Sequence, residues 1–230
     1  MKELLVNSLY FGMVLSIGTY LFGVWLRKKL PFAILNPLLV SILLTIGVLL
    51  VFKVDYPSYN EGAKYLSYFL TPATVCLAIP LYKQLELLKH HAAAVIGGIV
   101  SGVAASAFSI FALSKLFGLN HEYYVTLLPK SITTAIGIGV SEEAGGIVTL
   151  TVVSIVITGI LGNVIADFIF KLFRIKEPVA KGLALGTSAH AIGTARALEM
   201  GEIEGAMSSL AIAVAGLLTV VAVPLVSGLI

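Results

Sequence analysis

The sequence predicts an all-α polytopic membrane protein with two inverted repeats and broken or re-entrant helices, in roughly seven to eight membrane segments. Hydrophobic residues make up 58% of the chain and charged residues only 12%, and the mean hydropathy is +1.02. A soluble domain carries about 25% charged residues, so this composition would leave large apolar patches in water. Apolar runs also reach the length of about 20 residues that a helix needs to cross a bilayer.

Five apolar runs are long enough to cross the hydrocarbon core as helices. They cover residues 4–26, 32–52, 92–117, 145–170 and 206–229. The first run is too long for the core of a signal peptide and lacks a small-residue cleavage site, so we expect it to remain as a membrane helix.

Three further segments, 65–82, 127–141 and 182–200, are apolar but interrupted by Pro, Gly, Ser and Thr. Breaks of this kind free backbone N–H and C=O groups that lipid cannot satisfy. They persist where protein, water or a ligand completes the hydrogen bonding, so we expect function in these segments.

Loop charge predicts the orientation. Basic residues gather at 27–29, 83–91 and 171–181, and the positive-inside rule places such loops in the cytoplasm. The first and third interrupted segments then cross completely, and the N-terminus lies outside. Segment 127–141 must re-enter and leave on the same side, with Glu142 and Glu143 external.

A faint internal repeat agrees with this topology. A shift of 116 residues lays Thr71 on Thr187, with low identity elsewhere. We expect one transmembrane domain over residues 1–230, with a first helix at 4–26, one repeat at 30–117 and a second at 127–230. Inverted repeats with discontinuous helices recur in secondary transporters.

Segment 127–141 offers a candidate anion site. Pro129 suits the first turn of a helix, whose free N–H groups attract anions. Lys130 adds a positive charge, and the hydroxyls of Ser131, Thr133 and Thr134 follow it. The alternative is an interfacial lysine at an ordinary helix end, and both interpretations stay open.

Segment 182–200 carries His190 and Arg196 among small residues. An ionisable group at membrane depth usually faces a cavity or a partner. Arg196 can bind a carboxylate, and His190 can donate a hydrogen bond or titrate. Thr194 shares a helix face with His190, and Gly193 is expected to mark a break. The alternatives are a snorkelling arginine, a packing histidine and a tight crossing of small residues.

The ligand expected from these residues is a small organic anion, because the segments supply cations and hydroxyls, with no carboxylate except Asp167 near a helix end. No enzyme motif is present, and Cys76 alone gives neither a disulfide nor a metal site. We expect no enzyme, cofactor, metal or nucleic-acid function. Coupling to H⁺ or Na⁺ stays open.

Three long motifs carry a family resemblance. They are FLTPATVCLAIPLYKQ (69–84), LLPKSITTAIGIGVSEEAGG (127–146) and AKGLALGTSAHAIGTARALEMGEIEGAMSSLA (180–211). They resemble the LrgB/CidB family of bacterial membrane proteins. The resemblance implies a multi-pass protein of the bacterial cytoplasmic (inner) membrane, labelled antiholin-like and linked to murein hydrolase control and autolysis, beside a small LrgA/CidA-type membrane partner.

The family also resembles half of the plastid glycolate/glycerate translocator, and related bacterial pairs are associated with pyruvate transport. The favoured function is therefore a carrier for monocarboxylates of the pyruvate, lactate, glycolate and glycerate class, working by alternating access. A regulator of murein hydrolase activity without transport is the alternative, and a passive channel also stays open. By analogy with transporter architecture we expect a homodimer. The positions that match the motifs, and are expected to bind substrate, are Thr71, Pro72, Thr74, Lys130, Ser131, Thr133, Thr134, Ser188, His190, Thr194 and Arg196.

Overall fold

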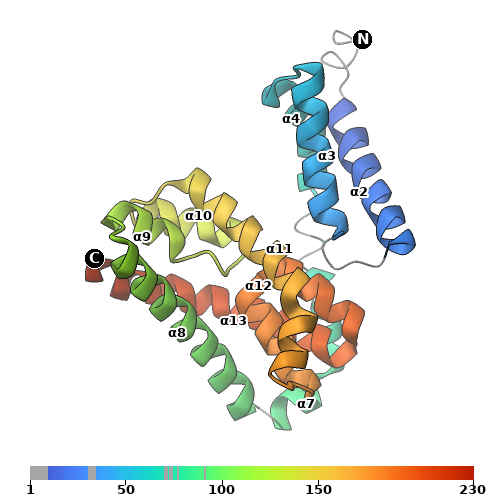
Figure 1. Ribbon diagram of the computed structural model, residues 1–230. Helices are drawn as coiled ribbons and strands as arrows, with labels where there is room; N and C mark the ends of the chain where they lie inside the picture. Colours follow the sequence, from blue (N-terminus) through green and yellow to red (C-terminus); the bar gives the residue numbers. More distant parts are fainter. Residues whose placement is uncertain (1–9, 31–34, 70–71, 73–74, 77, 91) are drawn as a thin grey trace. The chain divides into compact units, whose positions relative to one another are not determined.

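The computed structural model describes residues 10–30, 35–69, 72, 75–76, 78–90 and 92–230, and every regular element among them is a helix. The all-α prediction is confirmed for these residues. Contacts divide the chain into two compact units, Met1–Cys76 and Leu77–Ile230, and each is described by itself (Figure 1).

The first unit contains α2 (Phe11–Lys29), α3 (Pro37–Phe52) and α4 (Tyr56–Ser67), with α2 packed against both of the others. The side-chain oxygen of Asn36 starts α3 by accepting from the Leu38 N–H at 2.8 Å, as helix N-caps do. This helix is apolar but only 16 residues long, which is shorter than a bilayer crossing. It covers part of the predicted run 32–52, and α2 covers part of the run 4–26. Residues 1–9 and 31–34 lie outside the described residues.

The second unit holds the remaining helices. They are α6 (Ala78–Lys83), α7 (Leu85–His90), α8 (Ala92–Phe117), α9 (His121–Leu127), α10 (Thr134–Glu143), α11 (Val148–Leu172), α12 (Pro178–Met200), α13 (Glu202–Val226) and the short 3₁₀ turn η1 (Ser227–Leu229). Helix α12 is central, because it packs against α8, α11 and α13. Helix α13 in turn packs against α6, α8 and α10.

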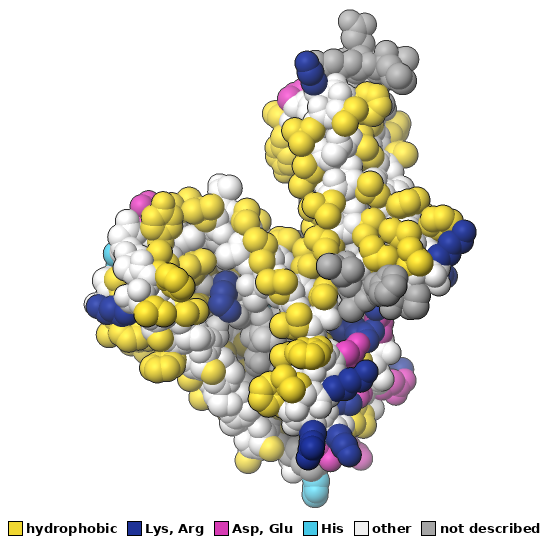
Figure 2. Space-filling view, viewed as in Figure 1, with side chains coloured by type: hydrophobic (Ala, Val, Ile, Leu, Met, Phe, Trp, Pro, Cys, Tyr) yellow, Lys and Arg dark blue, Asp and Glu magenta, His cyan; other side chains and the backbone are white. Residues whose placement is uncertain are grey.

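Three of the five predicted crossing runs are confirmed as helices long and apolar enough to span a bilayer. Among the described residues these are Ala92–Phe117, Val148–Leu172 and Glu202–Leu229. Figure 2 shows apolar side chains over much of the surface, while many charged side chains of the second unit gather at one end of it. This distribution suits helices whose sides face lipid and whose ends face water.

The interrupted segments form broken or short helices. Segment 182–200 lies within α12, which has a non-helical residue in its interior. Segment 127–141 is divided between the end of α9, a turn and α10. The ten residues of α10 extend about 15 Å, half of a bilayer core of about 30 Å. Segment 65–82 contains the end of α4 and most of α6, and residues 70–71, 73–74 and 77 lie outside the described residues.

The core of the second unit lies between α8, α12 and α13. Val95, Ile99, Leu183, Met207 and Ala211 are among its buried members. Helices α12 and α13 approach closely at Gly186, where an added Cβ would lie 2.5 Å from the Ser208 carbonyl oxygen. Small residues permit such close crossings of membrane helices, so the small residues at the start of the third motif have a packing role.

Candidate functional site

Lys130 lies in a turn between α9 and α10. The Lys130 N–H donates to the Leu127 carbonyl at 3.1 Å, and the Ile132 N–H donates to the Pro129 carbonyl at 3.3 Å. Helix α10 begins only at Thr134, with Thr133 as its N-cap. The prediction that Pro129 begins a helix is therefore wrong. Pro129 follows the last turn of α9, where its nitrogen has no proton to continue the helix.

A buried network of hydroxyls holds the base of this turn against α11. The Thr151 hydroxyl donates to the Thr126 carbonyl at 3.0 Å and lies 2.6 Å from the Ser141 hydroxyl. The Ile147 N–H donates to the Thr126 hydroxyl at 2.8 Å. The three side chains are fully buried, and satisfied buried networks of this kind rigidify the structure around them. The turn that carries Lys130 thus has a fixed base.

A cavity of about 660 Å³ lies between this turn, α8 and α12. Small and hydroxyl-bearing residues dominate its lining, which consists of Gly98, Ser101, Gly102, Ala105, Ser106, Ser109, Lys130, Ser131, Ala180, Leu183, Ala184, Thr187 and Ser188. The cavity brings together three predicted site residues, Lys130, Ser131 and Ser188. The cavity is open to the surface, because Ser101, Ser109 and Ser188 in its lining are exposed.

Lys130 is the cation of this cavity. Its Nζ donates to the Ser131 hydroxyl at 3.1 Å, and the Ser131 and Ser106 hydroxyls lie 3.2 Å apart. No ion pair joins Lys130 to a carboxylate of the described residues. A lysine without a counter-ion beside hydroxyl groups can bind an anion, because its remaining protons need acceptors.

His190 and Thr194 connect helices and do not line this cavity. The backbone of α12 breaks at His190 itself, with φ 42° and ψ −136°, so the predicted break at Gly193 is misplaced. The His190 ring is buried, and its Nε2 atom lies 2.9 Å from the Ile155 carbonyl oxygen of α11. The Thr194 hydroxyl lies 2.7 Å from the Ser208 hydroxyl of α13. The His190 ring thus connects α12 with α11, and its role in binding a substrate stays a prediction.

Arg196 is neutralised and does not reach the cavity lining. One guanidinium nitrogen lies 2.5 Å from the Asp167 carboxylate of α11, and another lies 2.7 Å from the Glu199 carboxylate. The Arg196 side chain is 20% exposed and that of Asp167 51%. Two carboxylates thus already balance the charge of Arg196, and its role in attracting an anion stays a prediction.

The other predicted residues lie elsewhere. Thr133 and Thr134 are half-buried at the start of α10, outside the cavity lining. Pro72 is exposed and belongs to the first unit. Thr71 and Thr74 lie outside the described residues.

Sequence reasoning missed the contribution of α8. Its cavity face consists of Gly98, Ser101, Gly102, Ala105, Ser106 and Ser109. Steps of three and four residues place such positions on one side of a helix. The stripe of small and polar residues inside the long apolar run 92–117 is the sequence pattern that could have predicted this cavity wall. Thr187 of α12 also lines the cavity, and it had been noted only as a position in the repeat.

Comparison with known proteins identifies the family. Residues 16–229 match the model of the LrgB-like family. The chain belongs to the LrgB-like family. It is 41% identical to the antiholin-like protein LrgB of Bacillus cereus (strain B4264) over 217 residues, which is 94% of each chain. Proteins of the same name from Bacillus cereus (strain AH187) and Bacillus anthracis (strain A0248) show the same identity and coverage.

No solved structure matches this LrgB-like protein. The resemblance predicted from the three motifs is confirmed by the family match. Family membership and three helices of crossing length together identify an LrgB-like helical membrane protein.

Proposed function

We propose that this LrgB-like protein is a multi-pass carrier of the bacterial cytoplasmic (inner) membrane for small monocarboxylates. The observation that carries the proposal is Lys130, a cation without a described carboxylate partner, in a cavity of about 660 Å³. An uncompensated charge inside a membrane protein usually marks a substrate or ion pathway.

The chemistry of the cavity suits a small monoanion. One lysine supplies one positive charge, and the lining contains no carboxylate to repel an anion. The Ser106 and Ser131 hydroxyls offer further hydrogen bonds to a carboxylate or to a hydroxyl or keto group, whereas the Ser188 hydroxyl donates to the Ala184 carbonyl at 2.6 Å. The substrate class is therefore that of pyruvate, lactate, glycolate and glycerate, which the sequence resemblance also implies.

The arrangement of helices supports alternating access. Helices α6 and α8 belong to the proposed repeat 30–117, and α12 and α13 belong to the proposed repeat 127–230. Helix α12 packs against α8, and α13 packs against α6. Two related repeats would make such reciprocal contacts. The short α10 and the broken α12 are comparable to the discontinuous helices of secondary transporters. In this proposal segment 127–141 re-enters the membrane, segments 65–82 and 182–200 cross it, and Glu142 and Glu143 face outward.

Uptake into proteoliposomes tests the proposal. Labelled pyruvate, lactate, glycolate and glycerate are supplied with and without an LrgA/CidA-type partner, and saturable uptake with counterflow is expected for at least one acid. Lys130→Gln should lower uptake efficiency at least about tenfold, the effect of one lost charged hydrogen bond. Lys115→Gln, at the exposed end of α8, is the matched control. Absence of saturable uptake in both preparations would refute the carrier.

A second candidate function is regulation of murein hydrolase activity and autolysis without transport. The observation in its favour is the name of the relatives, antiholin-like protein LrgB. A regulator would act through its apolar helix faces, on an LrgA/CidA-type partner or within a homodimer. Autolysis assays with Lys130→Gln separate the two functions, because a regulator that acts through helix faces keeps its effect when the cavity loses its charge.

A further inference from the structure

Helix α12 folds back on itself at His190, where the backbone has φ 42° and ψ −136°. A Cβ added to Gly193 would lie 2.5 Å from the Leu185 carbonyl oxygen. Along a straight helix Leu185 and Gly193 would be about 12 Å apart, so the helix axis must turn back between them. Helix α12 is therefore a helical hairpin, with one arm before His190, a second arm after it and His190 at the tip.

Both ends of this hairpin lie beside the start of α13. Near the beginning of α12, a Cβ added to Gly182 would collide with the Glu204 carbonyl oxygen. Near its end, the Leu198 side chain lies against Gly205. Gly182 and Leu198 would be about 24 Å apart along a straight helix, yet they contact consecutive residues of α13. Helix α12 thus begins and ends at the same end of α13.

The hairpin runs alongside α11, which is long enough to span a bilayer. At the tip, His190 Nε2 lies 2.9 Å from the Ile155 carbonyl oxygen. Leu185 of the first arm and Ala197 of the second share a buried cluster with Phe170, near the end of α11. Both arms therefore extend from the end of α11 into its span, and the tip stops within that span.

The α9–α10 hairpin, formed by α9, the turn and α10, approaches the same point from the other end of α11. The Ser141 hydroxyl, near the end of α10, lies 2.6 Å from the Thr151 hydroxyl, near the start of α11. Closer to the turn, a Cβ added to Gly137 would lie 2.5 Å from Cδ1 of Ile155. The two hairpins thus point toward each other from opposite ends of α11 and meet at Ile155.

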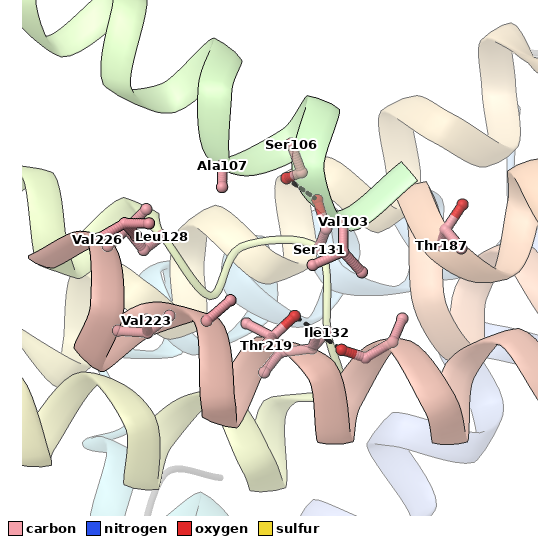
Figure 3. A pocket seen from close by; sticks show the side chains of 12 residues that line it. Val103, Ser106, Ala107, Leu128, Ser131, Ile132, Thr187, Thr219, Val223 and Val226 are labelled. Atoms are coloured by element: carbon pink, nitrogen blue, oxygen red, sulfur yellow. Dashed lines mark hydrogen bonds between the residues drawn. The ribbon is translucent and has the colours of Figure 1, made fainter. Parts of the chain in front are cut away.

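Helix α13 passes from one hairpin to the other. Its start contacts both arms of α12, whereas Val223 and Val226, near its end, pack with Leu128 at the end of α9 (Figure 3). The segment Glu202–Leu229 is also long and apolar enough to span a bilayer. The bases of the two hairpins therefore belong to opposite faces of the membrane.

We infer that α12 is a re-entrant hairpin opposed to the α9–α10 hairpin, and that the two hairpins are the gates of the proposed carrier. The gates rest on the proposed function, whereas the hairpin changes one part of its topology. In place of a full crossing, segment 182–200 enters and leaves at the face of the basic loop 171–181. Helix α13 then ends at the face of Glu142 and Glu143.

The Lys130 cavity lies where the two gates meet. Lys130 belongs to the turn of the α9–α10 hairpin, and Ser188 lies close to the tip of α12; both line the cavity. An anion on Lys130 would therefore be covered toward one face by the α9–α10 hairpin and toward the other by α12. Movement of either hairpin would expose the anion to a single face, as alternating access requires.

Cysteine labelling tests the hairpin without any transport measurement. Cys76, the only cysteine of the chain, is replaced by Ser, and single cysteines are introduced at Glu177 and Glu202, exposed residues on either side of α12. A membrane-impermeant maleimide should label both in inside-out vesicles and neither in intact cells. Labelling of the two positions from opposite faces would overturn the inference and leave the carrier intact.

Glu122→Cys before the α9–α10 hairpin and Leu229→Cys after α13 are the matched controls, because both residues are exposed. Both should be labelled in intact cells, and labelling of Leu229→Cys only in inside-out vesicles would also overturn the inference. Ser188→Cys, exposed in the cavity, should be labelled from the face of Glu177. Failure to label it from that face would overturn the gates. Absence of saturable uptake by a correctly labelled protein would refute the carrier and its gates, and would leave the hairpin in place.

Discussion

Gly159 of α11 is the position where one methyl group should disturb the packing at the break in α12. An added Cβ would lie 2.7 Å from Cε1 and 2.8 Å from Nε2 of the His190 ring, and 2.7 Å from Cδ1 of Ile192. Contacts this short force a side chain or a helix to move. The His190 ring would then leave the Ile155 carbonyl oxygen, which now lies 2.9 Å from Nε2.

The expected change in the free energy of unfolding is the balance of three contributions. Overpacking a buried contact costs about 1–3 kcal/mol, and loss of one hydrogen bond costs about 1 kcal/mol more. Alanine favours a helix over glycine by about 1 kcal/mol, which offsets part of this. Gly159→Ala should therefore destabilise the fold by about 1–3 kcal/mol.

Thermal unfolding in detergent, followed by circular dichroism at a fixed scan rate, measures this change. Gly97→Ala in α8 is the matched control, because nothing lies within 4 Å of a Cβ at that position. It should be neutral or stabilising by up to about 1 kcal/mol. The two substitutions are thus expected to change the Tm in opposite directions. A Gly159→Ala protein as stable as Gly97→Ala would show that His190 does not pack against α11 as described.

Three further outcomes are expected. Thr151→Val removes two hydrogen bonds of the buried network and should lower the unfolding free energy by about 1–3 kcal/mol. Ser154→Ala is the control, because it removes only a hydrogen bond within α11. It should lower the unfolding free energy by less than half as much. Arg196→Gln should leave the KM for the carried acid within about threefold of wild type, in contrast to Lys130→Gln, because Arg196 does not line the cavity and already pairs with Asp167 and Glu199. Loss of uptake would return Arg196 to the binding site. Tyr124→Phe removes the hydrogen bond to the Val226 carbonyl at 3.0 Å and should lower stability by about 1 kcal/mol, measurable by the same thermal unfolding, and an unchanged Tm would contradict the bond.

Hydropathy alone predicted much of the helical architecture. The runs 92–117, 145–170 and 206–229 correspond to α8, α11 and α13, because an apolar run of sufficient length is itself the physical requirement for crossing a bilayer. Local breaks were harder to place. The helix of the third motif breaks at His190 and not at Gly193, because contacts with α11 and α13 decide where the backbone departs from helical geometry.

The sequence by itself determined that the protein is apolar and helical and that cations and hydroxyls concentrate in interrupted segments. Only the tertiary structure decided which cation is paired with carboxylates and which has none among the described residues. Arg196 and Asp167 are 29 residues apart, so their ion pair exists only once α11 lies beside α12. The polar stripe of α8 likewise becomes a cavity wall only when Lys130 and α12 face it. Charge and hydropathy are properties of individual residues. The pairing of a cation with a carboxylate, and the formation of a cavity wall, depend on which helices pack together.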